Sequence, residues 1–163
     1  MTFRLQHGEN VPEGVRRIVA EQLDKAIGHL ESDDQERDKH VHEARKAIKR
    51  LRAVLRLVRY DLGGKQYRRE NEVFRDAGRQ LSGLRDATVL IETLDRLVEE
   101  LGRRAPRSKF ARVRQWLVQR REAAYQHTAT GDEVVAQLRR AFQHLEQWPL
   151  KHRDWGAVKG GLQ

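Results

Sequence analysis

Positively charged side chains are concentrated between His42 and Arg59, and this stretch is the part of the sequence best suited to chemistry. If the stretch is helical, at about 100° per residue its apolar residues gather on one side and its basic residues on another. Like charges three or four positions apart repel, at about 0.2–0.5 kcal/mol per pair in an isolated helix. No acid follows Glu43 until Asp61. The pattern therefore predicts that an anion binds the basic face.

The candidate anion-binding residues are the basic stretch itself and two arginines further along the chain. They are His42, Arg45, Lys46, Lys49, Arg50, Arg52, Arg56, Arg79 and Arg85. At about 1.5 Å per residue, the row from His42 to Arg56 extends over roughly 21 Å, which suits an extended polyanion. Arginine offers planar, bidentate forks to phosphate oxygens, and lysine a point charge. The alternative is a solvated face whose long side chains cover apolar surface.

Other kinds of chemistry find less support in the residues. The chain has no cysteine, and His40 and His42 are two positions apart, so they point to different faces of a helix. We expect no metal and no cofactor. A glycine-rich phosphate loop, a Ser/His/Asp arrangement and a carboxylate pair are also missing, so we expect a non-enzymatic protein with no catalytic residues. An enzyme or phosphate carrier that uses His42 as phosphoacceptor or general acid is the alternative.

Composition narrows the choice of partner. The chain has 33 Lys plus Arg against 24 Asp plus Glu, a net charge of +9 and a sequence pI near 10.3. This balance implies an anionic partner: polyphosphate, nucleic acid or an anionic surface. Tryptophans do not alternate with the basic row, so a nucleic-acid binder using this face would lack a stacking platform. No apolar run is long enough for a membrane span, and the start lacks the apolar region of a signal peptide, so we expect a cytoplasmic protein.

The elements that must position these residues are amphipathic helices. Apolar spacing and helix-stop signals predict helices at about 12–30, 36–62, 65–101, 107–128 and from 130 towards Pro149. We expect a bend near Ser82-Gly83, close packing at Gly78 and Gly83, and inward-facing Val89, Leu97 and Val113. Short connections predict an all-α, antiparallel bundle of four or five helices, forming a single domain over residues 1–163.

Two motifs carry a resemblance to a known family. His42-x-x-Arg45-x-x-x-Lys49-Arg50-Leu51-Arg52-x-x-Leu55-Arg56 is followed by Leu81-x-x-Leu84-Arg85-Asp86-x-x-Val89-Leu90. Together they resemble the CHAD family, the conserved histidine α-helical domain, over roughly residues 11–150. The resemblance implies a helical fold that binds inorganic polyphosphate through these basic residues, and association with polyphosphate granules. The Glu-x-Glu-x-Lys signature of the triphosphate-tunnel domain fused to some members is missing, so its activity is not implied.

The resemblance also bears on assembly. The family domain usually has two similar halves, each with a basic, histidine-containing helix, whereas this chain has one such helix and is half-CHAD-like. Its tail, residues 150–163, resembles the segment that opens the second half. A single half would leave uncovered the surface that normally packs on its partner. We therefore expect a homodimer in which two basic rows face one shared anionic path.

Overall fold

The computed structural model describes residues 3–33, 36–102, 107–126, 130–152 and 154–162, and these residues contain helices and no strand. The helices are α1 (Val11–Leu30), α2 (Arg37–Leu57), α3 (Arg59–Leu62), α4 (Gly64–Leu101), α5 (Arg107–Gln126), α6 (Thr130–His144) and α7 (Gly156–Lys159). Short 3-10 turns follow α6 at Leu145–Gln147 and α7 at Gly160–Leu162. The predicted all-α class is confirmed.

Helix α1 begins where its local sequence favours a start. Asn10 caps the helix, and its Oδ1 accepts a hydrogen bond from the backbone N–H of Glu13 at 2.9 Å. Pro12 lies in the first turn, where its missing N–H costs nothing. The spacing of Val15, Ile18 and Val19 then buries one side of the helix.

The second predicted helix is divided in the structure. The sequence predicts one helix to Leu62, but α2 ends at Leu57 and α3 begins at Arg59. The C-terminal segment packs at this break, so closely that a Cβ on Gly161 would overlap the Leu57 carbonyl. Gly63, with a φ of 82°, then turns the chain into α4, a conformation that glycine adopts without strain.

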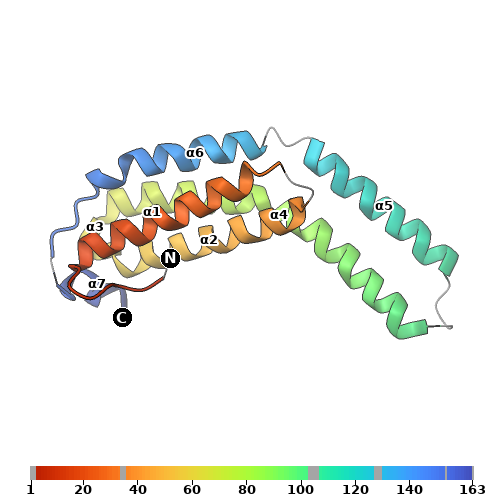
Figure 1. Cartoon of the computed structure of the whole chain (residues 1–163), viewed down its shortest axis with the longest axis horizontal. Coiled ribbons are helices and arrows are strands. Elements are labelled where there is room, and N and C mark those ends of the chain that lie inside the picture. Colours follow the sequence, from red (N-terminus) through yellow and green to blue (C-terminus); the bar gives the residue numbers. More distant parts are fainter. Residues whose placement is uncertain (1–2, 34–35, 103–106, 127–129, 153, 163) are drawn as a thin grey trace.

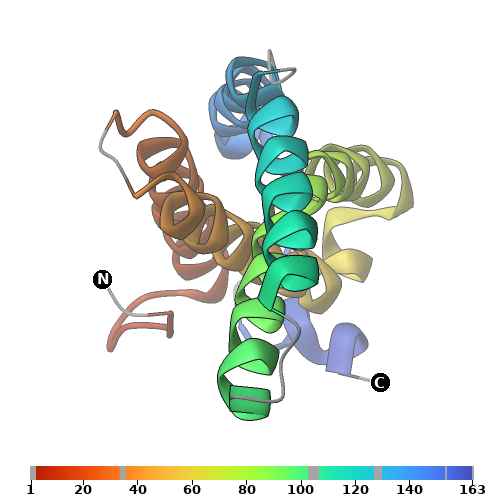
Figure 2. The same ribbon diagram turned by 90° about the vertical axis from the view of Figure 1, so that its right-hand side faces the viewer.

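Four long helices surround the core (Figures 1 and 2). They are α1, α2, the first part of α4, and α6, and α7 closes one end of the bundle. The largest fully buried apolar side chains are Leu23 of α1, Ile48, Leu51 and Leu55 of α2, Phe74 and Leu81 of α4, Leu138 of α6, and Trp148. The basic face of α2 is therefore presented on a helix whose opposite side is fixed in the core.

Helix α5 lies outside this bundle, in contrast to the predicted five-helix alternative. Helix α4 runs without interruption from Gly64 to Leu101 but changes direction where it leaves the bundle (Figure 1). Its distal part and α5 form a projecting hairpin, and Figure 2 shows that hairpin in front of the bundle. Because no further described helix covers the hairpin, the predicted burial of Val89, Leu97 and Val113 is wrong: all three are exposed.

The two glycines of α4 differ in their surroundings. A Cβ on Gly78 would lie 3.5 Å from Ile48 Cγ2, so this position faces α2 at ordinary contact distance, as expected. A Cβ on Gly83 would meet nothing within 4 Å. The prediction that Gly83 permits close packing is therefore wrong, since this glycine faces away from the neighbouring helices.

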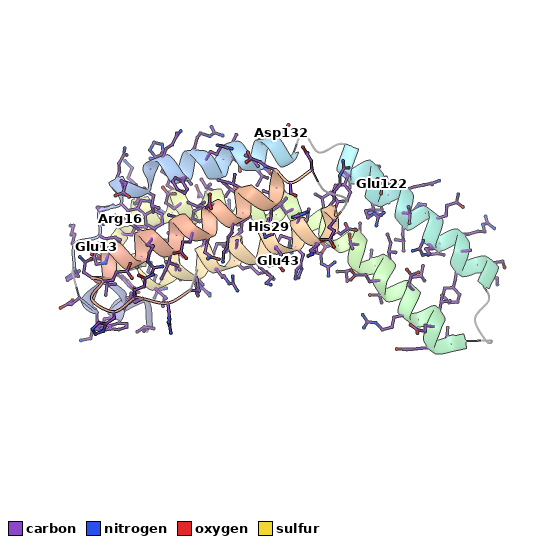
Figure 3. The ribbon with its side chains drawn as sticks, viewed as in Figure 1. Glu13, Arg16, His29, Glu43, Glu122 and Asp132 are labelled. Carbon is purple, nitrogen blue, oxygen red and sulfur yellow. The ribbon has the colours of Figure 1, made fainter. Side chains whose placement is uncertain are left out.

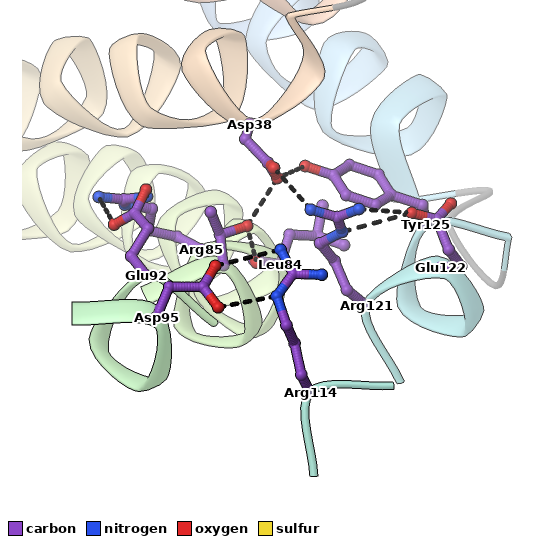
Figure 4. A network of polar contacts seen from close by, with 10 residues as sticks. Asp38, Leu84, Arg85, Glu92, Asp95, Arg114, Arg121, Glu122 and Tyr125 are labelled. Carbon is purple, nitrogen blue, oxygen red and sulfur yellow. Dashed lines mark hydrogen bonds and ion pairs between the residues drawn. The ribbon is translucent and has the colours of Figure 1, made fainter. Parts of the chain in front are cut away.

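Polar contacts around Asp38 hold the base of the hairpin to the bundle (Figure 4). Asp38, in the first turn of α2, accepts hydrogen bonds from Thr88 Oγ1 of α4 and Tyr125 OH of α5, both at 2.6 Å. Arg121 of α5 adds an ion pair at 3.2 Å. Burial and the hydrogen bond to Asp38 raise the pKa of Tyr125 well above its ordinary value. One carboxylate thus connects three helices.

The C-terminal tail packs against the end of the bundle near α2 and α3. Ala157 and Val158 of α7 are buried there. Asp61 of α3 accepts a hydrogen bond from the backbone N–H of Lys151 at 2.9 Å and is itself buried. These contacts integrate the described part of residues 150–163 into the packed unit.

Candidate anion-binding site

Five basic residues of α2 form a row along the side of the helix next to α4. His42, Arg45, Lys49, Arg52 and Arg56 fall within about 80° of arc at 100° per residue. Arg45 is half-buried and the other four are exposed. We call these five residues the α2 row.

Contacts with α4 orient two members of this row. Arg45 Nη1 donates a hydrogen bond to the Leu81 carbonyl at 3.2 Å, and Arg52 Nε donates to Asn71 Oδ1 at 3.3 Å. No hydrogen bond or ion pair joins the side chain of Lys49 to another residue in the described part of the chain. Its ammonium group is therefore available to a ligand.

A hollow of about 270 Å³ lies between α2 and α4 at the middle of the row. Among the described residues, its lining includes five cations and no carboxylate. The lining residues are Arg45, Ile48, Lys49, Arg52, Phe74, Arg75, Gly78, Arg79 and Ser82. The absence of a side chain at Gly78 keeps the floor of this hollow open between the two helices. We call it the α2–α4 groove.

Asp76 is the acid closest to the charges of the groove. It forms an ion pair with Arg75 at 2.8 Å and lies 4.0 Å from Arg79. The hydrogen bond with Arg75 lowers the pKa of Asp76 and raises that of Arg75. Both groups are therefore charged at neutral pH, and Asp76 offsets part of the positive charge contributed by α4.

Two predicted residues of α2 lie on another side of the helix. Lys46 forms an ion pair with Glu43 at 2.9 Å, and Glu43 lies beside His29 of α1 (Figure 3). Arg50 Nη1 donates to Gln22 of α1 at 3.4 Å, and its guanidinium lies 5.7 Å from the centre of the Phe3 ring. Lys46 and Arg50 thus face the α1 side, outside the α2–α4 groove.

The two predicted arginines of α4 have different positions. Arg79 lines the groove. Arg85 forms an ion pair with Glu92 at 3.1 Å (Figure 4). It does not line the groove. The neighbouring Asp86 accepts a hydrogen bond from Ser82. Arg75 was missed, although its position one turn before Arg79 repeats the spacing of Arg45 and Lys49 and could have indicated it.

A larger hollow of about 410 Å³ lies between α4 and α6. Its cations, Arg69 and Arg140, are accompanied by Glu70, Glu72 and Asp76. The carboxylates of Glu72 and Asp76 would repel a dense negative charge placed in this hollow. The α2–α4 groove is therefore the better anion site despite its smaller volume.

The fold and this groove define an all-α bundle protein that presents a row of cations between two packed helices. The sequence matches the family model of the CHAD domain over residues 17–159, and the chain therefore belongs to the CHAD domain family. Comparison with curated proteins and with solved structures gives no match. In the described residues no helix is long and apolar enough to cross a membrane, and no group of three or more His, Asp or Glu side chains is placed to hold a metal.

Proposed function

We propose that the chain binds inorganic polyphosphate along the α2–α4 groove. The observation that carries this proposal is the carboxylate-free lining with five cations among the described residues. Four of these cations are arginines, whose planar guanidinium groups can hold phosphate oxygens with two hydrogen bonds each. A phosphate chain carries charge along its whole length, so it can contact cations from both walls of the groove.

The extent of the α2 row favours a long anion over a single phosphate group. His42 and Arg56 continue the row beyond the two ends of the groove, for a total of roughly 21 Å at about 1.5 Å per residue. Arg75 and Arg79 lie opposite the middle of the row. We infer that several consecutive phosphates lie along α2 while α4 contributes contacts near the centre. Such binding would bring the chain to polyphosphate granules in the cytoplasm.

The proposed role is binding without a chemical step. The groove lining includes neither a histidine nor a carboxylate among the described residues, and histidine is the side chain that most often serves in general acid–base catalysis. His42 lies at the exposed end of the row, where it can donate a hydrogen bond to a bound phosphate. The His42→Gln variant should keep most of the polyphosphate affinity. If that variant instead loses a phosphate-transfer activity of the wild type, the enzyme alternative is the correct one.

Nucleic acid would use the same cations but with fewer specific contacts. Phe74 is the aromatic residue in the groove lining, and it is fully buried, so bases cannot stack on it. Duplex DNA should therefore bind through its phosphates alone and compete less well than polyphosphate at equal phosphate concentration.

Titration with long-chain polyphosphate at two salt concentrations tests the proposal. If about five phosphates are neutralised, affinity should fall on the order of 100-fold between about 50 and 200 mM salt, because each contact releases counterions. Duplex DNA is added as competitor in a second series. Absence of polyphosphate binding at low salt would contradict the proposal, and equally strong competition by DNA would indicate a general nucleic-acid binder.

A further inference from the structure

The projecting hairpin exposes a row of leucines. Leu90, Leu94, Leu97 and Leu101 follow one another at spacings of four, three and four residues, which places them on one side of α4. Leu90, Leu97 and Leu101 are 52%, 45% and 40% exposed. Spacing of this kind is typical of a helix that packs along its length against another helix.

Helix α5 adds apolar side chains to the same face of the hairpin. Ile91 of α4 and Leu117 of α5 are buried where the two helices meet. The ion pair of Asp95 with Arg114, at 2.7 Å, lies to one side of that contact. At 100° per residue the leucine row falls on the opposite side, together with Val113 and Trp116 of α5, which are 47% and 55% exposed.

The charges on this face are divided between the two helices. Asp86 and Glu100 flank the leucine row on α4, whereas Lys109 and Arg120 accompany Val113 and Trp116 on α5. The guanidinium of Arg120 lies 5.3 Å from the centre of the Trp116 ring. Since Asp95 is level with Arg114 in this antiparallel pair, Glu100 is level with Lys109. The face thus has an acidic edge and a basic edge.

We propose that a second copy of this chain covers the apolar face, with the two hairpins forming an intermolecular four-helix bundle. A two-fold axis along the hairpin places α4 of one copy over α5 of its partner, so Glu100 meets the partner's Lys109 and the leucine row meets the partner's Val113 and Trp116. A two-fold axis across the hairpin would instead place acidic edges together. Charge complementarity therefore selects the first arrangement.

The size of the face sets the expected strength of the dimer. The face is about sixteen residues of α4 long, at about 1.5 Å per residue, and two helices wide, with the helices about 10 Å apart. The buried area is therefore on the order of 500 Å² per partner. This area is at the low end of specific interfaces, so the dimer should be reversible and dependent on concentration. The interface lies on the hairpin and not beside the α2 row, so none of its residues belongs to the α2–α4 groove.

Sedimentation equilibrium of the whole chain across a concentration series tests the leucine row. The wild type should approach twice its 19.1 kDa mass as concentration rises. Leu90→Gln with Leu97→Gln should remain monomeric with unchanged helicity, because both side chains are exposed. The control Phe142→Gln, at an exposed position of α6, should dimerise as the wild type does. A monomeric wild type, or a dimer unaffected by the leucine substitutions, would overturn the proposal.

Charge exchange tests the arrangement of the two copies. Glu100→Lys should weaken the dimer at least severalfold, and Glu100→Lys with Lys109→Glu should restore it. The control, Glu100→Lys with Lys65→Glu, has the same net charge as Glu100→Lys with Lys109→Glu. It changes an exposed lysine at the start of α4, away from the interface, so its dimer should stay weak. Equal restoration by both pairs, or by neither, would overturn the arrangement. Binding of anionic phospholipid vesicles by a monomeric wild type, abolished in Leu90→Gln with Leu97→Gln, would assign the face to a lipid surface.

Discussion

Individual side chains of the α2–α4 groove differ in how firmly they are held. Arg45 and Arg52 are oriented by hydrogen bonds to α4, whereas Lys49 makes no such contact within the described residues. Oriented arginines lose less freedom when they bind a phosphate, because part of the ordering cost is met in the folded protein. The groove therefore combines preorganised forks with one adaptable point charge.

Asp76 limits the positive charge of the groove, and its neutralisation should strengthen binding. Asp76→Asn removes the carboxylate that pairs with Arg75 and Arg79. We expect the polyphosphate affinity to rise roughly two- to fivefold, the scale of one exposed charge pair. Isothermal titration calorimetry measures the change. Asp95→Asn, which removes an equivalent acid from its pair with Arg114 in the hairpin, is the matched control, and an equal gain there would contradict a local effect.

Glu70 should make stability depend on pH in a defined direction. Burial raises its pKa in the folded protein, so the folded chain holds this proton more tightly than the unfolded chain, whose glutamate pKa is about 4.3. The stability that this provides is fully present below that value and is lost as pH rises through the folded pKa. Glu70→Gln should therefore be more stable than wild type at neutral pH, with the difference declining in acid.

Urea unfolding at a series of pH values measures this effect. Glu72→Gln changes an exposed carboxyl in the same turn of α4 and serves as the control. A difference between Glu70→Gln and wild type that is constant over the whole series would mean that the carboxyl is not responsible.

At the level of helices, the Asp38 contacts determine how the hairpin joins the bundle. Asp38→Ala removes the acceptor for Thr88, Tyr125 and Arg121, and leaves polar groups without their partner (Figure 4). We expect a loss of about 1–3 kcal/mol in the free energy of unfolding. Thermal unfolding measures the loss. In hydrogen exchange, the substitution should accelerate exchange more in α5 than in α1. Protection that falls equally in both helices would contradict a role specific to the hairpin.

The spacing of apolar residues predicts where helices form, but not which other elements cover them. The spacing of apolar residues correctly gave an all-α fold and the start of α1, because both follow from local rules of helix formation. It could not show that α5 leaves the bundle, since the spacing of Val113 and Leu117 indicates a shared side but not what covers that side. The division at Val58 lies beside the contact of Gly161 with Leu57, and no local pattern can report such a contact between residues far apart in the sequence.

The same distinction applies to the candidate site. The α2 row could be predicted because its spacing lies within one helix. The separation of Lys46 and Arg50 from that row could not, because it depends on where α1 and α4 pack around α2. Pairing choices, such as Arg85 with Glu92 and not with Asp86, depend on rotamers and neighbouring helices.

For the whole molecule, the central question is whether a defined groove or the net charge of +9 attracts polyphosphate. A basic protein attracts any polyanion at low salt through its overall field. The groove hypothesis makes a narrower statement, because it assigns binding to one side of α2. Two sides of the same helix, each with exposed cations, allow the two explanations to be separated.

Polyphosphate titration of two double charge-reversal variants is the most direct measurement. Lys49→Glu with Arg52→Glu changes the α2–α4 groove, and Lys46→Glu with Arg50→Glu changes the α1 side by the same net charge. All four side chains are exposed, so both variants should fold. We expect the groove variant to lose at least about tenfold more affinity than the other, about 1.4 kcal/mol. Equal losses in the two variants would contradict the groove and assign the affinity to net charge.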